Sequence, residues 1–549
     1  MYIVLAGEGA GPRSNKLGGI WNVIDAEAKN LVKIVENDII VIAGPYFGRL
    51  GQDWSPNNRI TDITGFDEIE DGDIIEAIES LEIECITGKK NGINYVLFNA
   101  EDCLNKTVEY NGSEMRLSDA VKAEAFGLLG LDSLKYEKTS YGKEYTHYLN
   151  LSYTISEFSK NLSFKNPVSI HCHEFPVFYS LARLDRLKLP VKTVATFHAT
   201  KVGRTYGAKA IEKLVRGDSS HPENVQHGLV ELEKLAKYAD VITFVSDATR
   251  SEARLFYGVD GVVVRNGIDL TSEIIDWNKK TENLHRIRSF ISRTLRDLNG
   301  TIIDEDAIIP IYTISRLELE NKGYPDLLDS LVILDRILHN RIENGEIDEV
   351  KVFCILITAH GPKDPRKLPE GFPINLPDEI LVGDELRLKR MIEERNLDYK
   401  NLKRRSVCAL PYPQWVGRND GGFQMTIDEI ASGCVAGIFP SRYEPFLLTA
   451  LEACREASPV VISRACGFSG AVKELQKEKG IFGGVVLVDN VEQTYLQTIT
   501  DYAFGLHVII DAFLRDKAKD KMMCNVAFML AREMNWEEPV RDYYEILKK

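Results

Sequence analysis

Several features are scarce in this 549-residue sequence, and each absence excludes a class of protein. No run of about 18 apolar residues occurs, so we expect no membrane-spanning helix and no membrane partner. The nine cysteines are odd in number and include no Cys-x-x-Cys pair, which argues against a disulfide framework and favours a cytoplasmic location. The segment Met1 to Ala6 has no basic residue and too short an apolar run for a signal peptide, so we predict a first buried strand there.

Positive charge and nucleotide-binding loops are also scarce. The formal net charge is -15, whereas nucleic-acid binders usually carry the opposite sign, so we expect no nucleic-acid partner. No G-x-x-x-x-G-K-[ST] loop is present, which argues against a P-loop ATPase. The segment Gly7 to Pro12 is similar to a dinucleotide fingerprint, but proline stands where close helix packing requires glycine or alanine. We therefore expect no nicotinamide cofactor, and no other cofactor.

The composition is that of an ordinary globular protein, with 44% hydrophobic and 27% charged residues. Short apolar runs that end in polar or glycine turns alternate with helical stretches, which is the pattern of buried parallel strands in an α/β fold. The runs form two series, residues 39–43, 168–173, 191–197, 240–245 and 262–264, and then residues 308–314, 350–356, 436–440 and 460–462.

The two series predict two Rossmann-like domains, which a chain of this length also favours. A charged stretch of helical character, residues 270–306, separates them. We predict an N-terminal domain over 1–275, a C-terminal domain over 276–515, and helices over 516–549 that pack back on the first domain.

Lys16, Gly18 and Gly19 lie just before a helix predicted to begin near Ile20. Two glycines let a ligand approach the backbone, the helix start offers free N–H groups to an anion, and a lysine adds positive charge. One interpretation is a phosphate site. The other is a flexible turn with a surface lysine, and this segment alone favours the turn.

His171 and His173 are expected on one face of a strand, because side chains alternate along it. Two histidines without a third ligand in the sequence make a weak zinc site, so we predict no metal. His173 and Glu174 come at the carboxyl end of the strand, where open α/β sheets build ligand sites. The alternative is a packed histidine. A second metal-like motif, Asp71-Gly72-Asp73, lies in an acidic helical stretch, and we interpret it as surface.

Arg316 and Lys322 lie in the loop after the first strand of the second series. Two cations six residues apart in a loop can converge on a diphosphate, with arginine as a planar fork and lysine as a compact charge. Fixed cations would also stabilise the negative charge that a leaving diphosphate gains in a transition state. The alternative is a surface loop of mixed charge.

Glu444 and Glu452 flank a helix that we predict to begin at Pro445. Eight helical residues would place the two carboxylates about 80° and about 12 Å apart. That separation is too long for an acid and base acting at one bond. It suits two hydroxyl clusters of one elongated ligand, such as the hexose and ribose of a sugar nucleotide. The alternative is a helix cap and a solvated glutamate.

A set of short motifs follows one order along nearly the whole chain. They are Lys16-Leu17-Gly18-Gly19, Gly44-Pro45-Tyr46, His173-Glu174, Thr196-Phe197-His198-Ala199-Thr200, Gly203-Arg204, Asn266-Gly267, Arg316 through Lys322-Gly323, Tyr443-Glu444-Pro445 and Gly467-Phe468. This order resembles that of the glycogen synthases of the animal and fungal type. The resemblance implies a GT-B fold, in which two Rossmann-like domains face an interdomain cleft and a C-terminal helix crosses back to the first domain.

The resemblance also implies an activity and its partners. The chain would be a retaining, metal-independent glycosyltransferase that extends an α-1,4-glucan from a nucleotide-glucose donor, UDP-glucose or alternatively ADP-glucose, and it would form a homo-oligomer. By the same match, the catalytic residues would be Glu444, His173, Glu174, Arg316 and Lys322. The substrate-binding residues would be Lys16, Gly18, Gly19, Arg204, Asn266, Tyr443, Leu447, Leu448, Thr449 and Glu452.

One departure from the family affects the predicted donor site. Glycine and an aromatic residue usually follow the Glu-Pro-aromatic triplet, and Leu447 and Leu448 stand there in this chain. The change leaves two further hypotheses open. One is a GT-B enzyme that makes a small glycoside or disaccharide, and the other is an inactive glucan-binding protein.

Overall fold

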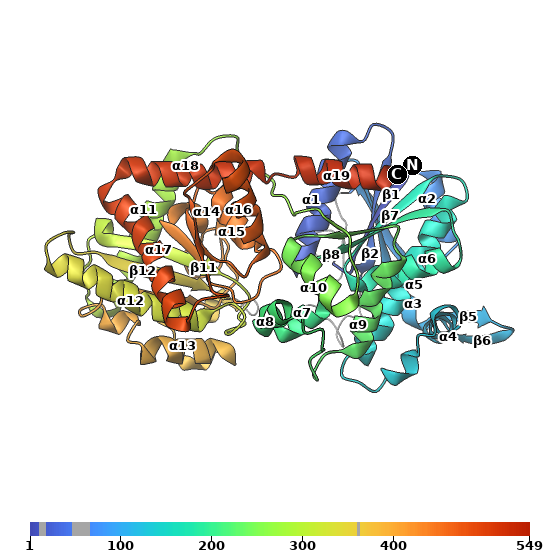
Figure 1. The fold of residues 1–549 in the computed structure, drawn as a ribbon, viewed down its shortest axis with the longest axis horizontal. Helices are drawn as coiled ribbons and strands as arrows, with labels where there is room; N and C mark the ends of the chain where they lie inside the picture. Colours follow the sequence, from blue (N-terminus) through green and yellow to red (C-terminus); the bar gives the residue numbers. More distant parts are fainter. Residues whose placement is uncertain (10–17, 47–65, 359–362) are drawn as a thin grey trace. The chain divides into compact units, whose positions relative to one another are not determined.

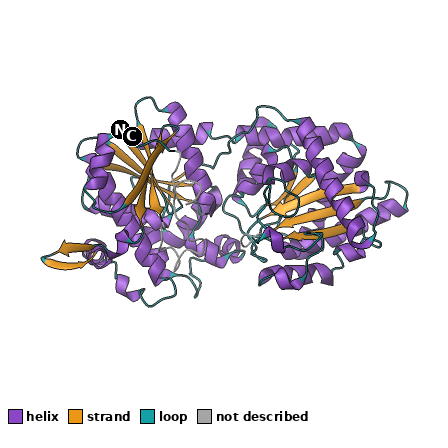
Figure 2. Cartoon of the chain, turned by 180° about the vertical axis from the view of Figure 1, so that it is seen from behind, coloured by secondary structure: helices purple, strands orange, loops and turns teal. Residues whose placement is uncertain are grey.

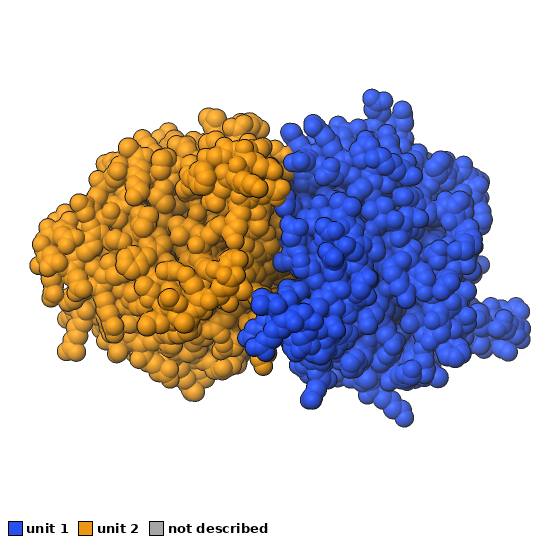
Figure 3. All heavy atoms as spheres, in the orientation of Figure 1, with its two compact units in different colours: residues 1–206, 212–269, 536–549 blue, residues 207–211, 270–535 orange. Residues whose placement is uncertain are grey.

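The structure, a computed structural model, describes residues 1–9, 18–46, 66–358 and 363–549. The chain divides into two compact units, which Figure 3 distinguishes by colour. Unit 1 contains Met1–Tyr206, Glu212–Asp269 and Trp536–Lys549, and unit 2 contains Gly207–Ile211 and Leu270–Asn535.

Unit 1 is built on an eight-stranded sheet with the order β10-β9-β8-β7-β1-β2-β4-β3. Every neighbouring pair is parallel except β3 and β4. The strands are β1 (Tyr2–Ala6), β2 (Ile39–Tyr46), β3 (Cys85–Lys90), β4 (Ile93–Asn99), β7 (Val168–His173), β8 (Val191–Phe197), β9 (Val241–Phe244) and β10 (Val262–Val263). The first predicted series of strands is thus confirmed, whereas β3 and β4 were not predicted.

Helices cover both faces of this sheet (Figures 1 and 2). One face carries α1 (Gly18–Ile34) and α19 (Glu537–Lys548), and the other carries α5 (Gly142–Ser163) and α6 (Phe178–Arg186). The remaining elements before residue 270 are α2 (Gly72–Glu79), α3 (Asp102–Asn105), α4 (Leu117–Leu129), α7 (Lys201–Tyr206), α8 (Lys209–Arg216), α9 (His227–Glu233), α10 (Asp247–Tyr257) and the hairpin of β5 (Thr107–Tyr110) and β6 (Ser113–Arg116).

Unit 2 is built on a six-stranded parallel sheet with the order β13-β12-β11-β14-β15-β16. The strands are β11 (Ile308–Ile314), β12 (Lys351–Ile357), β13 (Val407–Tyr412), β14 (Ala436–Phe439), β15 (Val460–Ser463) and β16 (Val485–Val488). The helices are α11 (Trp277–Asn299), α12 (Tyr324–Glu343), α13 (Asp384–Glu394), α14 (Ile427–Gly433), α15 (Leu448–Arg455), α16 (Gly467–Lys479), α17 (Tyr495–Arg515) and α18 (Lys517–Glu533). The four predicted strands are present, and β13 and β16 were not predicted.

The C-terminal helices divide between the units, which differs from the predicted boundary at residue 515. Cys524 and Phe528 of α18 pack with Ala457 in an apolar cluster of unit 2. Only the chain from Trp536 onward belongs to unit 1. There Tyr543 and Leu547 of α19 are buried, and the Leu547 carbonyl accepts a hydrogen bond from Ser169 Oγ of β7 at 2.7 Å. The buried face of each helix therefore determines the unit to which it belongs.

The structure bears on two further expectations, the place of the Asp71-Gly72-Asp73 motif and the absence of a membrane-spanning helix. Asp71 of the Asp71-Gly72-Asp73 motif caps α2, because its side chain accepts the N–H groups of Asp73 and Ile74. Its carboxylate also accepts the Tyr2 hydroxyl at 2.8 Å, so the motif serves a structural purpose. In the described part of the chain, none of the helices has the length and apolar character needed to cross a membrane.

Candidate active site

The carboxyl edge of the unit 1 sheet brings several predicted residues together, because neighbouring parallel strands end at one edge. His173 is the last residue of β7, Glu174 follows it, and His198 follows the neighbouring strand β8. The Nδ1 atom of His173 lies 3.1 Å from Nε2 of His198. The Glu174 carboxylate accepts the backbone N–H of His198 at 2.6 Å.

Glu174 holds the loop after β8. Its Oε1 atom accepts a second backbone N–H, that of Ala199, at 2.8 Å. Burial raises the pKa of its carboxyl, and Arg204 of α7 opposes that shift together with the two amides. The backbone of Glu174 has φ 70°, a strained conformation for a residue other than glycine and one that clusters at functional sites. The structure thus gives Glu174 a positioning contact with the His198 segment.

A buried carboxyl lies behind the two histidines of β7. Glu27 of α1 places Oε1 at 2.8 Å from Nδ1 of His171 and Oε2 at 3.4 Å from Nε2 of His173. Burial raises the Glu27 pKa to about 7 and lowers that of His171 to about 3. Sequence reasoning missed Glu27. The signal was available, since Glu27 shares the buried face of α1 with Ile24 and Leu31 and is a charged residue in an apolar stripe.

Among the described residues, Glu27, His171 and His173 form a group whose ligand atoms lie close enough to hold a metal ion, all within 4.8 Å of one another. All three side chains are fully buried, and a tetrahedral site would need a fourth ligand. One carboxylate and two neutral imidazoles would leave a divalent ion with uncompensated positive charge in an apolar interior. Since Glu27 and His171 already share a hydrogen bond, we assign a hydrogen-bonded cluster.

The other predicted residues of unit 1 lie on separate elements. Lys16 lies outside the described residues. Gly18 begins α1, and a Cβ added to Gly19 would meet nothing within 4 Å, so the backbone there is open to a ligand. Arg204 lies on α7, and Asn266 is buried in the chain after β10. Among the described residues, the Oδ1 atom of Asn266 has no hydrogen-bond partner.

In unit 2, the structure brings Lys322 and Glu444 into contact. Lys322 follows β11 and Glu444 follows β14, and these two strands are neighbours. Lys322 Nζ donates a hydrogen bond to Glu444 Oε2. The two side chains are 10% and 20% exposed, so the pair is largely removed from water but remains open to a ligand.

Backbone contacts fix the two loops that carry this pair. The Asn321 carbonyl accepts the backbone N–H of Arg442 at 2.8 Å. Gly323 has φ 67°, and a Cβ at this position would lie 2.0 Å from the Pro440 carbonyl oxygen. Glycine is therefore required both for the left-handed turn and for the close approach of the loops.

Arg316 is more exposed than its predicted role requires. Its side chain is 73% exposed and forms an ion pair with Glu318 at 3.0 Å. In the absence of a ligand, the guanidinium thus has an acidic partner in its own loop. A phosphate contact would require the side chain to exchange that partner.

The helix after Glu444 begins later than we predicted. Residue 444 forms a β-bridge with Cys466, and the Phe446 carbonyl accepts the N–H of Phe468 at 2.7 Å. These pairings keep the segment extended, and α15 begins only at Leu448. The helical separation predicted between Glu444 and Glu452 is therefore wrong. Glu452 is half-buried on α15, and Tyr443 is buried.

Leu447 occupies the N-cap position of α15 with φ 88° and ψ 58°, a left-handed conformation. A leucine in this region is strained. Leu448 and Thr449 are the first residues of the helix, where N–H groups lack intrahelical partners and can bind an anion.

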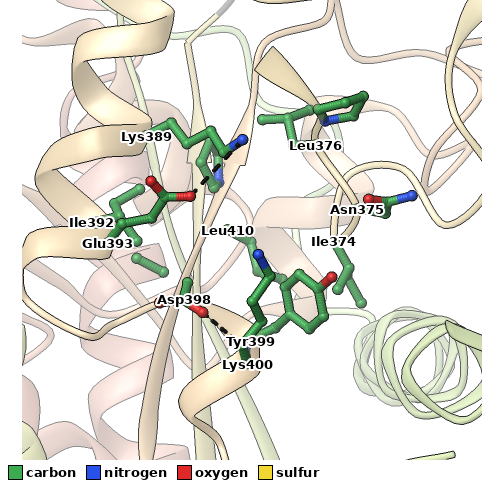
Figure 4. Close-up of a pocket in the computed structure, with 13 residues that line it drawn as sticks. Ile374, Asn375, Leu376, Lys389, Ile392, Glu393, Asp398, Tyr399, Lys400 and Leu410 are labelled. Atoms are coloured by element: carbon green, nitrogen blue, oxygen red, sulfur yellow. Dashed lines mark hydrogen bonds and ion pairs between the residues drawn. The ribbon is translucent and has the colours of Figure 1, made fainter. Parts of the chain in front are cut away.

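A cavity of about 160 Å³ lies elsewhere in unit 2, beside the edge strand β13 (Figure 4). Tyr399 and Lys400 line it together with Leu410 of β13. Lys389 of α13 also lines it and pairs with Asp378 and, at 3.9 Å, with Glu393. The lining contains none of the predicted site residues, and its lysine and acidic side chains largely balance in charge.

Comparisons with known proteins agree with the predicted fold and with the resemblance to glycogen synthases. A model for Glycosyltransferase Family 4 matches residues 134–272. A glycogen [starch] synthase of Dictyostelium discoideum is 25% identical over 57% of this chain and 43% of its own length. The glycogen [starch] synthase isoform 1 of Saccharomyces cerevisiae is 22% identical over 96% of this chain and 83% of its own length. The chain therefore spans less than half of the first relative and most of the second.

Solved structures give the fold. A trehalose-6-phosphate synthase from E. coli bound with UDP-2-fluoro glucose has a TM-score of 0.55 at 12% identity, with 100% of this chain and 99% of that chain covered. A sucrose-phosphate synthase from Thermosynechococcus elongatus has a TM-score of 0.51 at 13% identity, with 100% and 98% covered. The comparisons confirm the GT-B fold and the resemblance to the glycogen synthases.

Proposed function

We propose that this glycosyltransferase, a relative of the glycogen synthases, extends an α-1,4-glucan from UDP-glucose or ADP-glucose. The observation that carries the proposal is the contact between Lys322 and Glu444 at the carboxyl edge of the unit 2 sheet. A cation and a carboxylate side by side at this edge suit the two parts of a sugar nucleotide, its diphosphate and its hexose.

The chemistry follows from that pair. Lys322 and Arg316 would hold the diphosphate, and Glu444 would accept hydrogen bonds from the hexose hydroxyls. In the ligand-free protein each member of the Lys322–Glu444 pair compensates the charge of the other. When the donor binds, a phosphate replaces Glu444 as the partner of the amine. The same cation then stabilises the charge that the departing diphosphate gains, without a metal ion and with retention at the anomeric carbon.

The remaining predicted residues complete the two sides of the reaction. The backbone N–H groups near Leu447, Leu448 and Thr449 would bind phosphate, with Glu452 at the ribose and Tyr443 near the base. From unit 1, His173 and Glu174 would line the reacting centre, and Lys16, Gly18, Gly19, Arg204 and Asn266 would bind substrate. We further propose a cytoplasmic homo-oligomer with a nucleotide sugar and a glucan as its partners.

A donor screen tests this proposal. The purified chain is incubated with glycogen and each of UDP-glucose and ADP-glucose, and the released nucleoside diphosphate is measured. One donor should be turned over, and Lys322→Ala should lower the rate of release by about 10²–10³. Lys389→Ala is the matched control, because it also removes a paired lysine of unit 2 but lies at the β13 cavity. Full activity of folded Lys322→Ala would count against the assigned site.

A small-glycoside synthase is the second candidate. The strained Leu447 and the Leu447-Leu448 departure favour it, since they change the wall of the donor pocket. The two solved structures with this fold carry the names of trehalose-6-phosphate and sucrose-phosphate synthases. Radiolabelled donor offered to glycogen and to small sugars separates the two functions by the size of the labelled product.

An inactive glucan-binding protein is the remaining alternative. Isothermal titration with UDP and ADP distinguishes it from an enzyme, because a binding protein without transferase activity has no need of nucleotide affinity. Binding of either nucleotide that is weakened by Lys322→Ala supports the enzyme.

A further inference from the structure

Three polar side chains, those of Glu27, His173 and His198, form a continuous row from the interior of unit 1 to the carboxyl edge of its sheet, and His171 branches from Glu27. Glu27 contacts His171 at 2.8 Å and lies 3.4 Å from His173, and His173 Nδ1 lies 3.1 Å from His198 Nε2. Glu27, His171 and His173 are fully buried, whereas His198 follows β8 and retains 8% exposure. The row therefore ends at Glu27 in the interior and at His198, which is buried but retains slight exposure, near the carboxyl edge.

Two atoms of the row, one on Glu27 and one on His173, lack a conventional hydrogen bond. Oε2 of Glu27 and Nε2 of His173 are both buried, and neither has a hydrogen-bond partner among the described residues. They lie 3.4 Å apart. If both atoms stayed unpaired, the folded state would be destabilised by about 1–3 kcal/mol for each group. A proton shared between the two atoms is therefore the more stable arrangement.

We propose that Glu27 is a positioning residue whose carboxyl proton determines, through His173, whether His198 offers a hydrogen-bond donor or an acceptor at the carboxyl edge. The ring nitrogens of a neutral imidazole are one donor and one acceptor, so fixing one fixes the other. The state of Glu27 is thereby transmitted over two rings to Nδ1 of His198.

The two states differ by one proton. When Glu27 is protonated, Oε2–H donates to His173 Nε2, His173 Nδ1–H donates to His198 Nε2, and His198 keeps its proton on Nδ1. When Glu27 is ionised, His173 Nε2–H donates to Oε2, His198 Nε2–H donates to His173 Nδ1, and Nδ1 of His198 carries a lone pair. The proton released between these states leaves from Nδ1 of His198, and every ring remains neutral.

The surroundings favour neutral rings and an adjustable carboxyl. Burial lowers the pKa of His198 to about 3, and His171 and Arg204 of α7 add to that shift. Burial raises the Glu27 pKa to about 7, and His173 opposes it, so both states of Glu27 are accessible near neutral pH. In this proposal the buried Glu27 carboxyl changes its protonation state through the row, with the proton leaving from Nδ1 of His198.

The other groups that face the row have fixed roles. Nδ1 of His171 lies 2.8 Å from Oε1 of Glu27, and its Nε2 lies 2.5 Å from the Thr196 hydroxyl, which in turn lies 2.5 Å from that of Thr243 of β9. The Tyr543 ring of α19 lies 4.7 Å from the His171 ring. We assign the Nδ1–H tautomer to His171, so that His173 and His198 are the rings that change.

Solid-state ¹⁵N NMR of the full chain labelled in histidine tests the proposal without any assay of activity. Protonated and unprotonated ring nitrogens have well separated shifts, and His173→Gln and His198→Gln identify the signals. In the wild type, His198 should change from the Nδ1–H to the Nε2–H tautomer between pH 5.5 and 8.5, with the same midpoint as His173. A His198 tautomer that stays constant over this range overturns the proposal.

Glu27→Gln provides the variant. Its amide N–H can donate to His173 and its carbonyl can accept from His171, so it should fix the protonated pattern at every pH. Glu8→Gln is the matched control, because the pKa of Glu8, which also lies in unit 1, is raised by burial to about 7, yet Glu8 accepts a hydrogen bond from Tyr148 instead of contacting the row. An unchanged midpoint in Glu27→Gln, or one bound metal ion per chain by elemental analysis, would refute the assignment.

A second experiment measures transferase activity and therefore rests on the proposed function. The pH profile of kcat/KM should contain the NMR midpoint in the wild type and in Glu8→Gln, and lose it in Glu27→Gln. Absence of transferase activity with a normal NMR titration would refute the proposed function alone. Activity whose profile keeps the midpoint in Glu27→Gln would refute the role of Glu27.

Discussion

Lys322 and Glu444 depend on each other at the scale of single residues. Each is a largely buried charge whose partner is the other, so removal of either leaves a charge without compensation. The functional consequence differs between them, because the amine is proposed to act on phosphate and the carboxylate on the hexose.

For Lys322→Ala, we expect kcat to fall by about 10²–10³, the range seen when one fixed stabilising group is removed from a transition state. Glu444→Gln should affect turnover to a similar extent while it leaves nucleoside diphosphate binding intact. Initial rates and nucleotide titration measure the two effects. Equal loss of diphosphate affinity in both variants would contradict the division of roles.

Glu27 affects stability as well as the site. Its pKa is raised from 4.5 to about 7 in the folded protein, so the folded state binds more protons than the unfolded state between these values. Its contribution is present below pH 4.5 and is lost as the pH rises through 7. The total is at most about 3.5 kcal/mol, at about 1.4 kcal/mol for each pKa unit.

Glu27→Gln should therefore flatten the fall in unfolding free energy between pH 5 and 8. Urea unfolding at several pH values measures the slope for wild type and variant. Parallel slopes would show that Glu27 does not titrate in this window.

At the scale of elements, the sequence predicted most strands because each is a short apolar run that ends at a polar turn. It missed β3, whose residues are mostly exposed, and β13, where Pro411 interrupts the strand pattern. It also misplaced the start of α15. Pairing of residues 444 and 446 with the segment near Cys466 is a tertiary contact, and no local pattern contains it.

The candidate site was predictable to the same degree. Residues that follow strands in unit 2, such as Lys322 and Glu444, could be identified from position alone. Their direct contact and the cluster around Glu27 could not, because they join elements distant in the chain. The structure was needed to place Glu27 of α1 against β7.

Gly323 tests how the loop after β11 is held. Gly323→Ala would place a Cβ 2.0 Å from the Pro440 carbonyl oxygen at a positive φ, so the loop that carries Lys322 must shift. We expect loss of most activity and a destabilisation of about 2 kcal/mol or more.

Gly470→Ala is the control, because a Cβ there in α16 meets nothing within 4 Å. That change should stabilise the protein by about 0.5–1 kcal/mol through helix propensity and leave the rate unchanged. Thermal unfolding and initial rates compare the two variants. Equal rates would show that the Gly323 loop has no part in turnover.

At the scale of the whole molecule, unit 1 is assembled from distant parts of the chain. Tyr543 of α19 is 1% exposed and packs beside His171 of β7, whereas its neighbour Tyr544 is only partly buried and bonds Asp38. Burial of α19 thus links the stability of the first sheet to residues that follow unit 2.

Tyr543→Ala should lower the free energy of unfolding by about 3–5 kcal/mol, and Tyr544→Ala should lower it by about 1 kcal/mol. In Tyr543→Ala, amide hydrogen exchange should show reduced protection over β7 and β8 of unit 1, while β15 and β16 of unit 2 stay protected. Uniform loss of protection across both sheets would contradict the division of the chain into separate units.

We propose above all that this chain transfers glucose onto the end of an α-glucan. The most direct measurement supplies the chain with glycogen and radiolabelled nucleotide-glucose, then digests the product with a hydrolase that cleaves terminal α-1,4 linkages. The account predicts that label enters the polymer and is released completely by that digestion. Label found only in a disaccharide or sugar phosphate, or label in the polymer that resists the hydrolase, would contradict it.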